Sequence, residues 1–467
     1  MSIVSAYLLP HPPIAIEQVG KGRERRISRT INSFDKVSLE ISKISPETII
    51  FLSPHSTGYS DYFHISPGDK AEGNFSNFGA SKVKLTANYD QPLVESITHF
   101  AAEMGLPAGT QGEFEPALDH GMMVPMHFIN KHYTDYKSVR IALSGMEPLL
   151  HYKLGKAIYA AAYKLGRKTV LVASGDLSHK LTYDGPYGYA PEAAIFDNEI
   201  MTNLRQGDFL NLMQIDPNLR ERAAECGYLS AVIMAGCFDK QEVEASEYSY
   251  EGPFGVGYGV ARITATKPNA DRDIIFQYEK IKLERAKMLR EKEDEYVNLA
   301  RKSLEFIVNN GDNFKLTATD RNQMSDDLRF EKAGVFVTIY KNDYLRGCIG
   351  TTSPTQPNIA EEIILNAASA GLRDNRFPPV RKHELQFLTY KVDVLDTPEV
   401  ISDTSQLDVK IYGVIVELDR KRGLLLPNLD GVDTVKQQLE IVLKKAGIKQ
   451  NEPYVLKRFK VTRHEPL

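Results

Sequence analysis

The first half of the chain alternates short apolar runs, rich in β-branched residues, with segments of helical periodicity. The runs have the length of single strands, and they are Ser2–Leu9, Thr48–Leu52, Val139–Leu143 and Thr169–Ala173. Helical patterns such as Leu154–Leu165 separate them. This alternation predicts an α/β domain with a largely parallel central sheet, and it constrains the fold more than any other feature of the sequence.

The second half has a different pattern, in which strand-like segments occur in pairs. Residues 334–351 are predicted to form a hairpin with Lys341–Asp343 in its turn. Residues 389–397 and 412–427 add further strands, and the latter segment is expected to turn at Asp419–Gly423. The helical patterns of this half are Ile359–Gly371 and Val432–Ala446. Hairpins with a few helices predict an α+β domain built on antiparallel strands.

A densely charged segment separates the two halves. At 467 residues the chain is long for one hydrophobic core, so more than one domain is expected. Residues 267–290 are rich in Glu, Lys and Arg and contain no glycine, which favours a solvated helix. We therefore predict a first domain over residues 1–266, a charged helical linker over 267–290, and a second domain over 291–467.

A glycine-rich run, EGPFGVGYGVARITA at residues 251–265, closes the first half. Its glycines alternate with apolar residues, which makes it a poor phosphate-binding loop. We interpret it as a final strand whose backbone packs closely against its neighbours, and not as a nucleotide site.

The composition excludes several broad classes of function. The formal net charge is -4, so no overall attraction to nucleic acid is expected. No stretch approaches the roughly 20 apolar residues of a membrane helix, and the apolar N-terminus is predicted to be a strand and not a signal peptide. Three cysteines, Cys226, Cys237 and Cys348, are too few for a disulfide framework. We therefore expect a cytoplasmic protein with neither a membrane nor a nucleic-acid partner.

Polar side chains follow three of the predicted strands, and most of them are histidines. Nine of the eleven histidines lie before residue 180. His11 follows the first strand, His55 follows the second, and Asp176 and His179 follow the fourth. Open parallel sheets bind ligands at the carboxyl ends of their strands, so these four side chains are expected to meet in one crevice.

His11 and His55 are the candidate metal ligands, since neutral imidazoles bind transition metals. A third ligand can come from either of two adjacent residues, Glu225 and Cys226. Two histidines with a carboxylate favour non-haem Fe(II), whereas a thiolate in third place favours softer metals. The residues alone leave this choice open.

His120 and His179 are the candidate acid–base groups, because imidazole titrates near neutral pH. Asp176 precedes His179 by three residues and is predicted to orient it. These three residues are therefore the predicted catalytic groups of the first domain.

The motifs of the first half, taken in order, resemble a known superfamily. HPP after the first strand, SPHS, DHG, SGDLSH and ECG are similar to the class III extradiol dioxygenase superfamily and its MEMO-like branch, over roughly residues 1–265. The resemblance to the ring-cleaving members implies Fe(II) held by His11, His55 and Glu225. It also implies a further histidine as the acid–base group.

The MEMO-like branch implies a different third ligand. A cysteine takes that place in the branch, and Cys226 matches it here, in the Cys-Gly dipeptide of the branch. The branch also implies His120, Asp176 and His179 as pocket residues. Fe(II) is the expected cofactor, with zinc or copper as alternatives.

Two segments of the second half resemble the AMMECR family. They are LRGCIG at residues 345–350 and DNRFPP at residues 374–379, which follows the predicted helix. The likeness spans about residues 290–467, and it is specific because the two segments together are an unusual pairing.

These segments place a thiol among arginines. Arg346, Arg373 and Arg376 could hold a carboxylate or phosphate, and Cys348 beside them could act as a nucleophilic thiolate. The competing interpretation is that Cys348 is a packed core residue and that Arg373 and Asp374 only fix the loop. The sequence leaves both interpretations open.

The order of the two domains resembles the AmmeMemoRadiSam system, here as a fusion of its MEMO-like and AMMECR-like proteins. The resemblance implies a radical SAM partner with an iron–sulfur cluster. This chain has no CxxxCxxC motif, so that chemistry is expected in the partner. We expect a metal-dependent, non-haem iron oxidoreductase of extradiol-dioxygenase type that acts on a small diol or carbonyl compound. The alternatives are a non-catalytic scaffold that binds a substrate or peptide for the radical SAM partner, and a zinc-dependent hydrolase.

Overall fold

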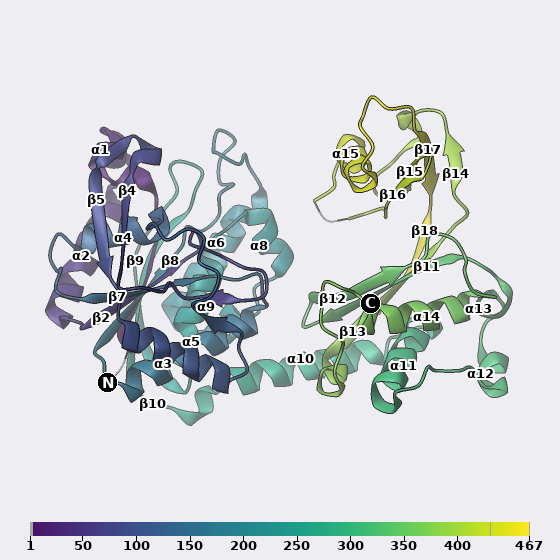
Figure 1. Ribbon diagram of the computed structural model, residues 1–467, viewed down its shortest axis with the longest axis horizontal. Helices are drawn as coiled ribbons and strands as arrows, with labels where there is room; N and C mark the ends of the chain where they lie inside the picture. The colour runs from purple at the N-terminus through teal and green to yellow at the C-terminus, as the bar shows by residue number, and fades with distance from the viewer. Residues whose placement is uncertain (1–2, 430, 467) are drawn as a thin grey trace. The chain divides into compact units, whose positions relative to one another are not determined.

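The computed structural model describes residues 3–429 and 431–466. The chain divides into two compact units, residues 1–278 and 279–467, and each has hydrophobic cores of its own. The division falls within α10 (Ile274–Arg290), the helix that carries most of the charged segment (Figure 1).

The first unit is built on a six-stranded sheet with the order β7-β2-β8-β1-β10-β9. Its strands are β1 (Ile3–Leu9), β2 (Thr48–Ser53), β7 (Lys137–Ala142), β8 (Thr169–Ser174), β9 (Gln241–Glu251) and β10 (Tyr258–Pro268). The first four run parallel, whereas β10 is antiparallel to β1 and β9 is antiparallel to β10. The largely parallel sheet is therefore confirmed, with an antiparallel pair at one edge. Ser2, the first residue of the first predicted strand, lies outside the described residues.

Helices cover both faces of this sheet, because its central strands are apolar on both sides. In β2, Ile50 and Leu52 belong to a first hydrophobic core on one face of the sheet, and Ile49 and Phe51 belong to a second core on the other face. The helices packed on the first core are α3 (Gln91–Glu103), α5 (Pro148–Lys164), α6 (Pro191–Gln206) and α9 (Tyr228–Gly236). Those packed on the second core are α2 (Ser28–Ile44) and α4 (His120–Ile129).

The glycine-rich run at residues 251–265 is only partly a strand. β10 begins at Tyr258, and the residues before it form the turn from β9, a strand that the sequence analysis did not predict. The close packing expected there is present, because a Cβ atom at Gly257 would lie 2.1 Å from Asp197 Oδ2.

The second unit contains two antiparallel four-stranded sheets, as its pattern of hairpins predicts. The first has the order β12-β11-β13-β18, with β11 (Gly334–Lys341), β12 (Tyr344–Gly350), β13 (Leu388–Leu395) and β18 (Val461–His464). The second has the order β14-β17-β15-β16, with β14 (Glu399–Ile401), β15 (Gly413–Leu418), β16 (Lys421–Leu425) and β17 (Val455–Phe459).

Two turns of this unit test the predicted hairpins. Asn342 and Asp343 join β11 to β12, and both have positive φ, 54° and 72°, as the tight hairpin turn requires. The turn between β15 and β16 is shorter than predicted, because β16 already begins at Lys421 and Gly423 lies inside it.

Helices cover one face of each sheet in the second unit. α11 (Glu295–Asn310) and α14 (Ile359–Leu372) pack on the first sheet, and α15 (Val435–Ala446) packs on the second. α15 begins three residues later than predicted, because Thr434 and Gln437 form a capping box at its start. Among the described residues of both units, no helix combines the length and apolar character needed to cross a membrane.

Candidate metal centre

Three adjacent strands bring the predicted residues to one edge of the first sheet. β2, β8 and β1 are parallel neighbours, so their carboxyl ends lie together. His55 follows β2, His11 follows β1, and Asp176 and His179 follow β8. Cys226 reaches the same edge from the loop before α9, where its Sγ approaches the His11 ring.

Three potential ligand atoms converge at this edge. His11 Nε2 lies 3.0 Å from His55 Nε2 and 3.7 Å from Cys226 Sγ, and the three atoms all lie within 4.8 Å of one another. An ion bound about 2.0–2.1 Å from imidazole nitrogen and about 2.3 Å from thiolate sulfur separates such ligands by about 3–3.6 Å. The two separations from His11 Nε2 lie close to this range, so the three residues, which we call the His–His–Cys group, could hold a shared metal ion.

Glu225, the alternative third ligand, does not join this group. Its carboxylate accepts hydrogen bonds from Arg220 Nε at 3.3 Å and from the Tyr228 backbone N–H at 2.7 Å. It therefore pairs with Arg220 and caps the start of α9, where a negative charge is stabilising. The geometry favours Cys226 over Glu225, against the ligand set of the ring-cleaving members.

Burial governs the protonation of the three ligand side chains. It lowers the pKa of His11 well below the ordinary value, and the nearby His55 lowers that pKa further. Burial also lowers the pKa of His55, so both imidazoles are neutral near pH 7, the form that binds metals. Burial and the Asp176 carboxylate raise the pKa of the Cys226 thiol, and binding of a cation would release its proton.

The two predicted acid–base histidines border the His–His–Cys group. The His120 ring stacks on His55 with centroids 4.1 Å apart, and burial lowers the pKa of His120 to about 4. The His179 ring contacts Tyr187 with centroids 5.4 Å apart. Burial lowers the pKa of His179, and hydrogen bonding with the backbone of Ala224 and Leu177 opposes that shift.

Asp176 makes other hydrogen bonds than the predicted contact with His179. Its Oδ1 accepts the backbone N–H of His11 at 2.7 Å, and its carbonyl oxygen accepts the backbone N–H of Cys226 at 3.3 Å. Burial raises the pKa of this carboxyl group to about 7. Asp176 therefore ties the loop of His11 to the loop of Cys226, and none of these hydrogen bonds orients His179.

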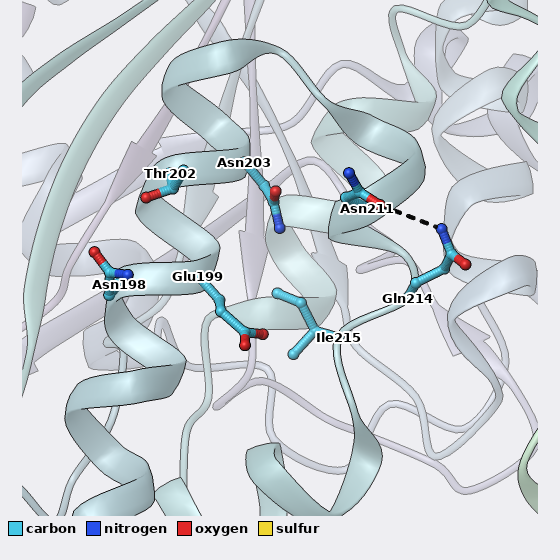
Figure 2. Close-up of a pocket in the computed structure, with 7 residues that line it drawn as sticks. All are labelled: Asn198, Glu199, Thr202, Asn203, Asn211, Gln214 and Ile215. Atoms are coloured by element: carbon cyan, nitrogen blue, oxygen red, sulfur yellow. Dashed lines mark hydrogen bonds between the residues drawn. The ribbon is translucent and has the colours of Figure 1, made fainter.

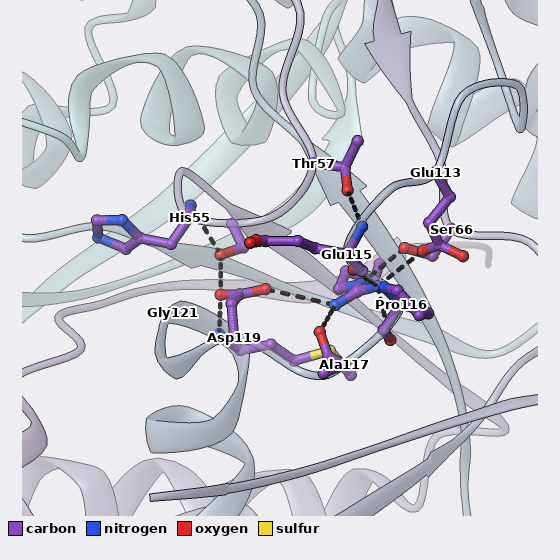
Figure 3. A network of polar contacts seen from close by, with 12 residues as sticks. His55, Thr57, Ser66, Glu113, Glu115, Pro116, Ala117, Asp119 and Gly121 are labelled. Carbon is purple, nitrogen blue, oxygen red and sulfur yellow. Dashed lines mark hydrogen bonds and ion pairs between the residues drawn. The ribbon is translucent and has the colours of Figure 1, made fainter. Parts of the chain in front are cut away.

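Arg140, which the sequence analysis did not single out, binds the polar loop beside His55. Figure 3 labels His55 together with Glu113, Ala117 and Asp119 of this network. This β7 side chain is 1% exposed, and its guanidinium donates to Glu113 and to the backbone carbonyl oxygens of residues 115–117. It also lies 3.6 Å from Asp119 Oδ2. A buried charge needs several such partners, and Arg140 obtains most of them from one loop.

Asp119 links this network to His55. Ser53 Oγ donates to Asp119 Oδ1 at 2.5 Å and accepts the His55 backbone N–H at 3.2 Å. Asp119 Oδ1 also accepts the Met122 backbone N–H and so caps α4, the helix that begins with His120. One carboxylate thus fixes the positions of two of the histidines in the site.

A separate cavity of about 330 Å³ lies between α6 and α7 (Phe209–Leu212) (Figure 2). The residues that line it are Asn198, Glu199, Thr202, Asn203, Asn211, Gln214 and Ile215. Amide and hydroxyl groups dominate, and Glu199 is the one ionisable residue among them. The cavity therefore offers polar binding groups but no acid–base pair.

The predicted site of the second unit is an ion-paired loop against a strand. Asp374 Oδ2 accepts the backbone N–H of Cys348 at 2.9 Å, and the Arg376 guanidinium donates to both carboxylate oxygens of Asp374 at 2.9 and 2.7 Å. Burial raises the pKa of the Cys348 thiol, although the hydroxyl of Thr338 and the charge of Arg376 oppose the shift. The thiol is therefore protonated near pH 7, which favours a packed residue over a nucleophile.

The other two predicted arginines differ from Arg376 in their contacts. Arg346 donates to both carboxylate oxygens of Glu384, each at 3.0 Å, so a carboxylate of the chain already occupies it. Arg373 follows α14 and is exposed. Of the five predicted residues, the structure joins Cys348, Asp374 and Arg376.

Comparison with known proteins identifies both halves of the chain. Residues 5–261 match the family of the catalytic LigB subunit of aromatic ring-opening dioxygenase. The chain belongs to the LigB family. Residues 297–465 match AMMECR1, so the LigB domain is fused to a C-terminal AMMECR1 domain. A protein of Clostridium acetobutylicum is 40% identical over 472 residues, with all of both chains covered, and therefore has the same fusion.

Other similar proteins cover parts of the chain. A Thermotoga maritima protein is 45% identical over 175 residues, which are 37% of this chain and 98% of that protein. An uncharacterized protein of Pyrococcus horikoshii has a solved structure that covers 38% of this chain and 94% of its own, with 29% identity and a TM-score of 0.34. The solved structure of an uncharacterized protein from Escherichia coli K12 covers 56% of this chain and 99% of its own, with 17% identity and a TM-score of 0.39.

Proposed function

We propose that the LigB domain is a metal-dependent oxidoreductase that uses non-haem Fe(II) and acts on a small diol or carbonyl compound. The observation that carries this proposal is the convergence of His11 Nε2, His55 Nε2 and Cys226 Sγ. Membership of a ring-opening dioxygenase family supports the same chemistry. Three protein ligands leave coordination positions open, and the oxygen atoms of such a substrate suit them.

A metal held by these residues would supply Lewis acidity to the substrate oxygens and redox chemistry to the reaction. His11 and His55 would bind it as neutral imidazoles, and the Cys226 thiolate would offset part of its charge. His179, whose pKa is lowered by burial and by the nearby His55, would be neutral and able to accept a proton from a substrate hydroxyl group. His120, stacked on His55, is the second group that can hold a proton there.

Metal analysis tests this proposal directly. The full chain, purified without air, is expected to contain stoichiometric iron and to consume oxygen with small diols. The double variant His11→Ala, His55→Ala is expected to lose the iron. His132→Ala is the matched control, because His132 is an exposed histidine outside the His–His–Cys group. Iron retained in the double variant would refute the proposed ligands.

The thiolate favours a second candidate, a zinc-dependent hydrolase. Cysteine and histidine are the ordinary ligands of zinc, and three of them with one open position resemble a catalytic zinc site. This function predicts stoichiometric zinc and turnover that continues without oxygen. The same metal analysis therefore separates the two candidates.

We also propose that the chain works with a radical SAM protein. The support is the resemblance of its domain pair to the AmmeMemoRadiSam system and the presence of the AMMECR1 domain. Mixing the purified full chain with a purified radical SAM protein of that system is expected to give a complex on size-exclusion chromatography. A metal-free chain that still forms this complex would instead indicate a non-catalytic scaffold.

A further inference from the structure

Ser174, the last residue of β8, lies between the His11 ring and helix α4. Its side chain is fully buried. Its Oγ lies 2.6 Å from the backbone carbonyl oxygen of Gly121 and 2.9 Å from His11 Nδ1. One hydroxyl group thus makes two hydrogen bonds, and the chemistry of its partners decides which atom donates in each.

The Gly121 carbonyl is available because of a proline in α4. In an α-helix the carbonyl oxygen of a residue accepts the N–H four positions later. For Gly121 that position is Pro125, which has no N–H. The Gly121 oxygen therefore cannot receive its usual helical bond, and it accepts the Ser174 hydroxyl proton instead.

The second bond then has a fixed direction. A serine hydroxyl has one proton, and Ser174 uses it on a carbonyl oxygen, which can only accept. Towards His11 the Ser174 oxygen can only accept, so His11 Nδ1 must carry the hydrogen. A neutral imidazole carries one N–H, which leaves a free lone pair on Nε2, the atom that faces His55 and Cys226.

We propose that Ser174 and Pro125 are positioning residues that select the tautomer of His11 in which Nε2 is the ligand atom. The inference rests on the proposed metal site, but it concerns a state of the metal-free protein. In that state the 3.0 Å contact between the two Nε2 atoms requires the hydrogen on His55. Metal binding must then move or release the His55 proton, whereas His11 is ready to bind.

Nitrogen NMR of the metal-free full chain, labelled with 15N-histidine, tests the proposal. The expected spectrum shows a protonated Nδ1 and an unprotonated Nε2 for His11, and a protonated Nε2 for His55. A protonated Nε2 on His11 in the wild-type protein would overturn the proposal without any variant. Ser174→Ala is expected to give a mixture of His11 tautomers and to weaken iron or zinc binding by about 10- to 100-fold.

Ser230→Ala is the matched control. Ser230 is also fully buried, and its Oγ donates to the backbone carbonyl oxygen of Ser174 at 2.8 Å. Its loss removes a comparable hydrogen bond beside the same residue, yet the His11 tautomer should not change. If Ser174→Ala and Ser230→Ala shift the spectrum equally, the effect is general loosening and the proposal fails.

Pro125→Ala keeps the proposal testable if Ser174→Ala does not fold. The alanine supplies an N–H that competes with Ser174 for the Gly121 carbonyl, so a smaller shift in the same direction is expected. An unchanged spectrum would remove Pro125 from the proposal. A wild-type chain with the expected tautomer that binds no metal would refute the proposed function and leave the tautomer assignment standing.

Discussion

The carboxylate of Asp176 accepts the backbone N–H of His11 at 2.7 Å, across 165 positions of sequence. This bond fixes the point where the chain leaves β1 and enters the site. Asp176→Ala leaves that buried N–H without its acceptor, and we expect the free energy of unfolding to fall by about 1–3 kcal/mol. Asp176→Asn keeps an acceptor oxygen and should lose much less. Urea unfolding of the full chain measures both, and equal losses would contradict this role.

Replacement of the thiolate by a carboxylate should change the preference for metals. Cys226→Asp gives the two-histidine, one-carboxylate set that favours Fe(II), whereas the native set also suits softer ions. We expect the ratio of iron to zinc affinity to rise in this variant, measured by competition between the two metals. Cys237→Ser serves as the control, because Cys237 is a buried cysteine in a different part of the domain. No change in the ratio would show that Cys226 is not a ligand.

Glu384 should make the second unit sensitive to acid. Burial by itself raises the pKa of Glu384, but hydrogen bonds from Arg346 and the Arg381 backbone, with the charge of Lys341, lower it to about 2. In the unfolded chain the carboxyl group titrates near its ordinary value of 4.5. Since the folded pKa is the lower one, the stabilisation is complete above pH 4.5 and disappears as the pH falls towards 2.

The variant Glu384→Gln tests this dependence. At pH 7 it should be less stable than wild type by about 1–3 kcal/mol, because it weakens a buried, charge-assisted pair. The difference should shrink steadily between pH 4.5 and 2. Hydrogen exchange of peptides from β12 and its neighbours follows the second unit by itself. A difference that does not depend on pH would exclude the ion pair as its cause.

Cys348 should react slowly with alkylating reagents. Burial raises the pKa of its thiol, so little thiolate is present at pH 7. We expect iodoacetamide to modify Cys348 in the folded chain at a small fraction of its rate in urea, as measured by mass spectrometry. Arg376→Ala removes a charge that opposes this shift and should slow the reaction further. Fast modification of the folded protein would support the nucleophile interpretation instead.

Residues at strand ends were the most predictable part of the site. His11 and His55 each follow an apolar run, and parallel strands place such positions at one edge of a sheet. Which strands are neighbours depends on packing between distant segments, and no local pattern shows that β8 lies between β2 and β1. The convergence could therefore be predicted, but not the distances.

Other parts of the site needed coordinates. Glu225 and Cys226 are adjacent in sequence, and only the path of the loop shows which side chain faces His11. Ser174 resembles any polar residue at a strand end. The role of Arg140 could have been predicted from the sequence, because an arginine inside an apolar run must find buried hydrogen-bond acceptors. The edge strand β9 was missed because its sequence, QEVEASEYSYE, is largely polar and forms no apolar run.

The guanidinium of Arg140 restrains the backbone of the loop on one side of the site. The loop before α4 is bonded to it through three successive backbone carbonyl oxygens and the Glu113 carboxylate. Three of these acceptors are backbone oxygens. Substitutions of the side chains of residues 115–117 would therefore leave those three hydrogen bonds in place. Since this loop is hydrogen-bonded to a buried guanidinium, we expect its backbone to keep its position when a small molecule approaches His55.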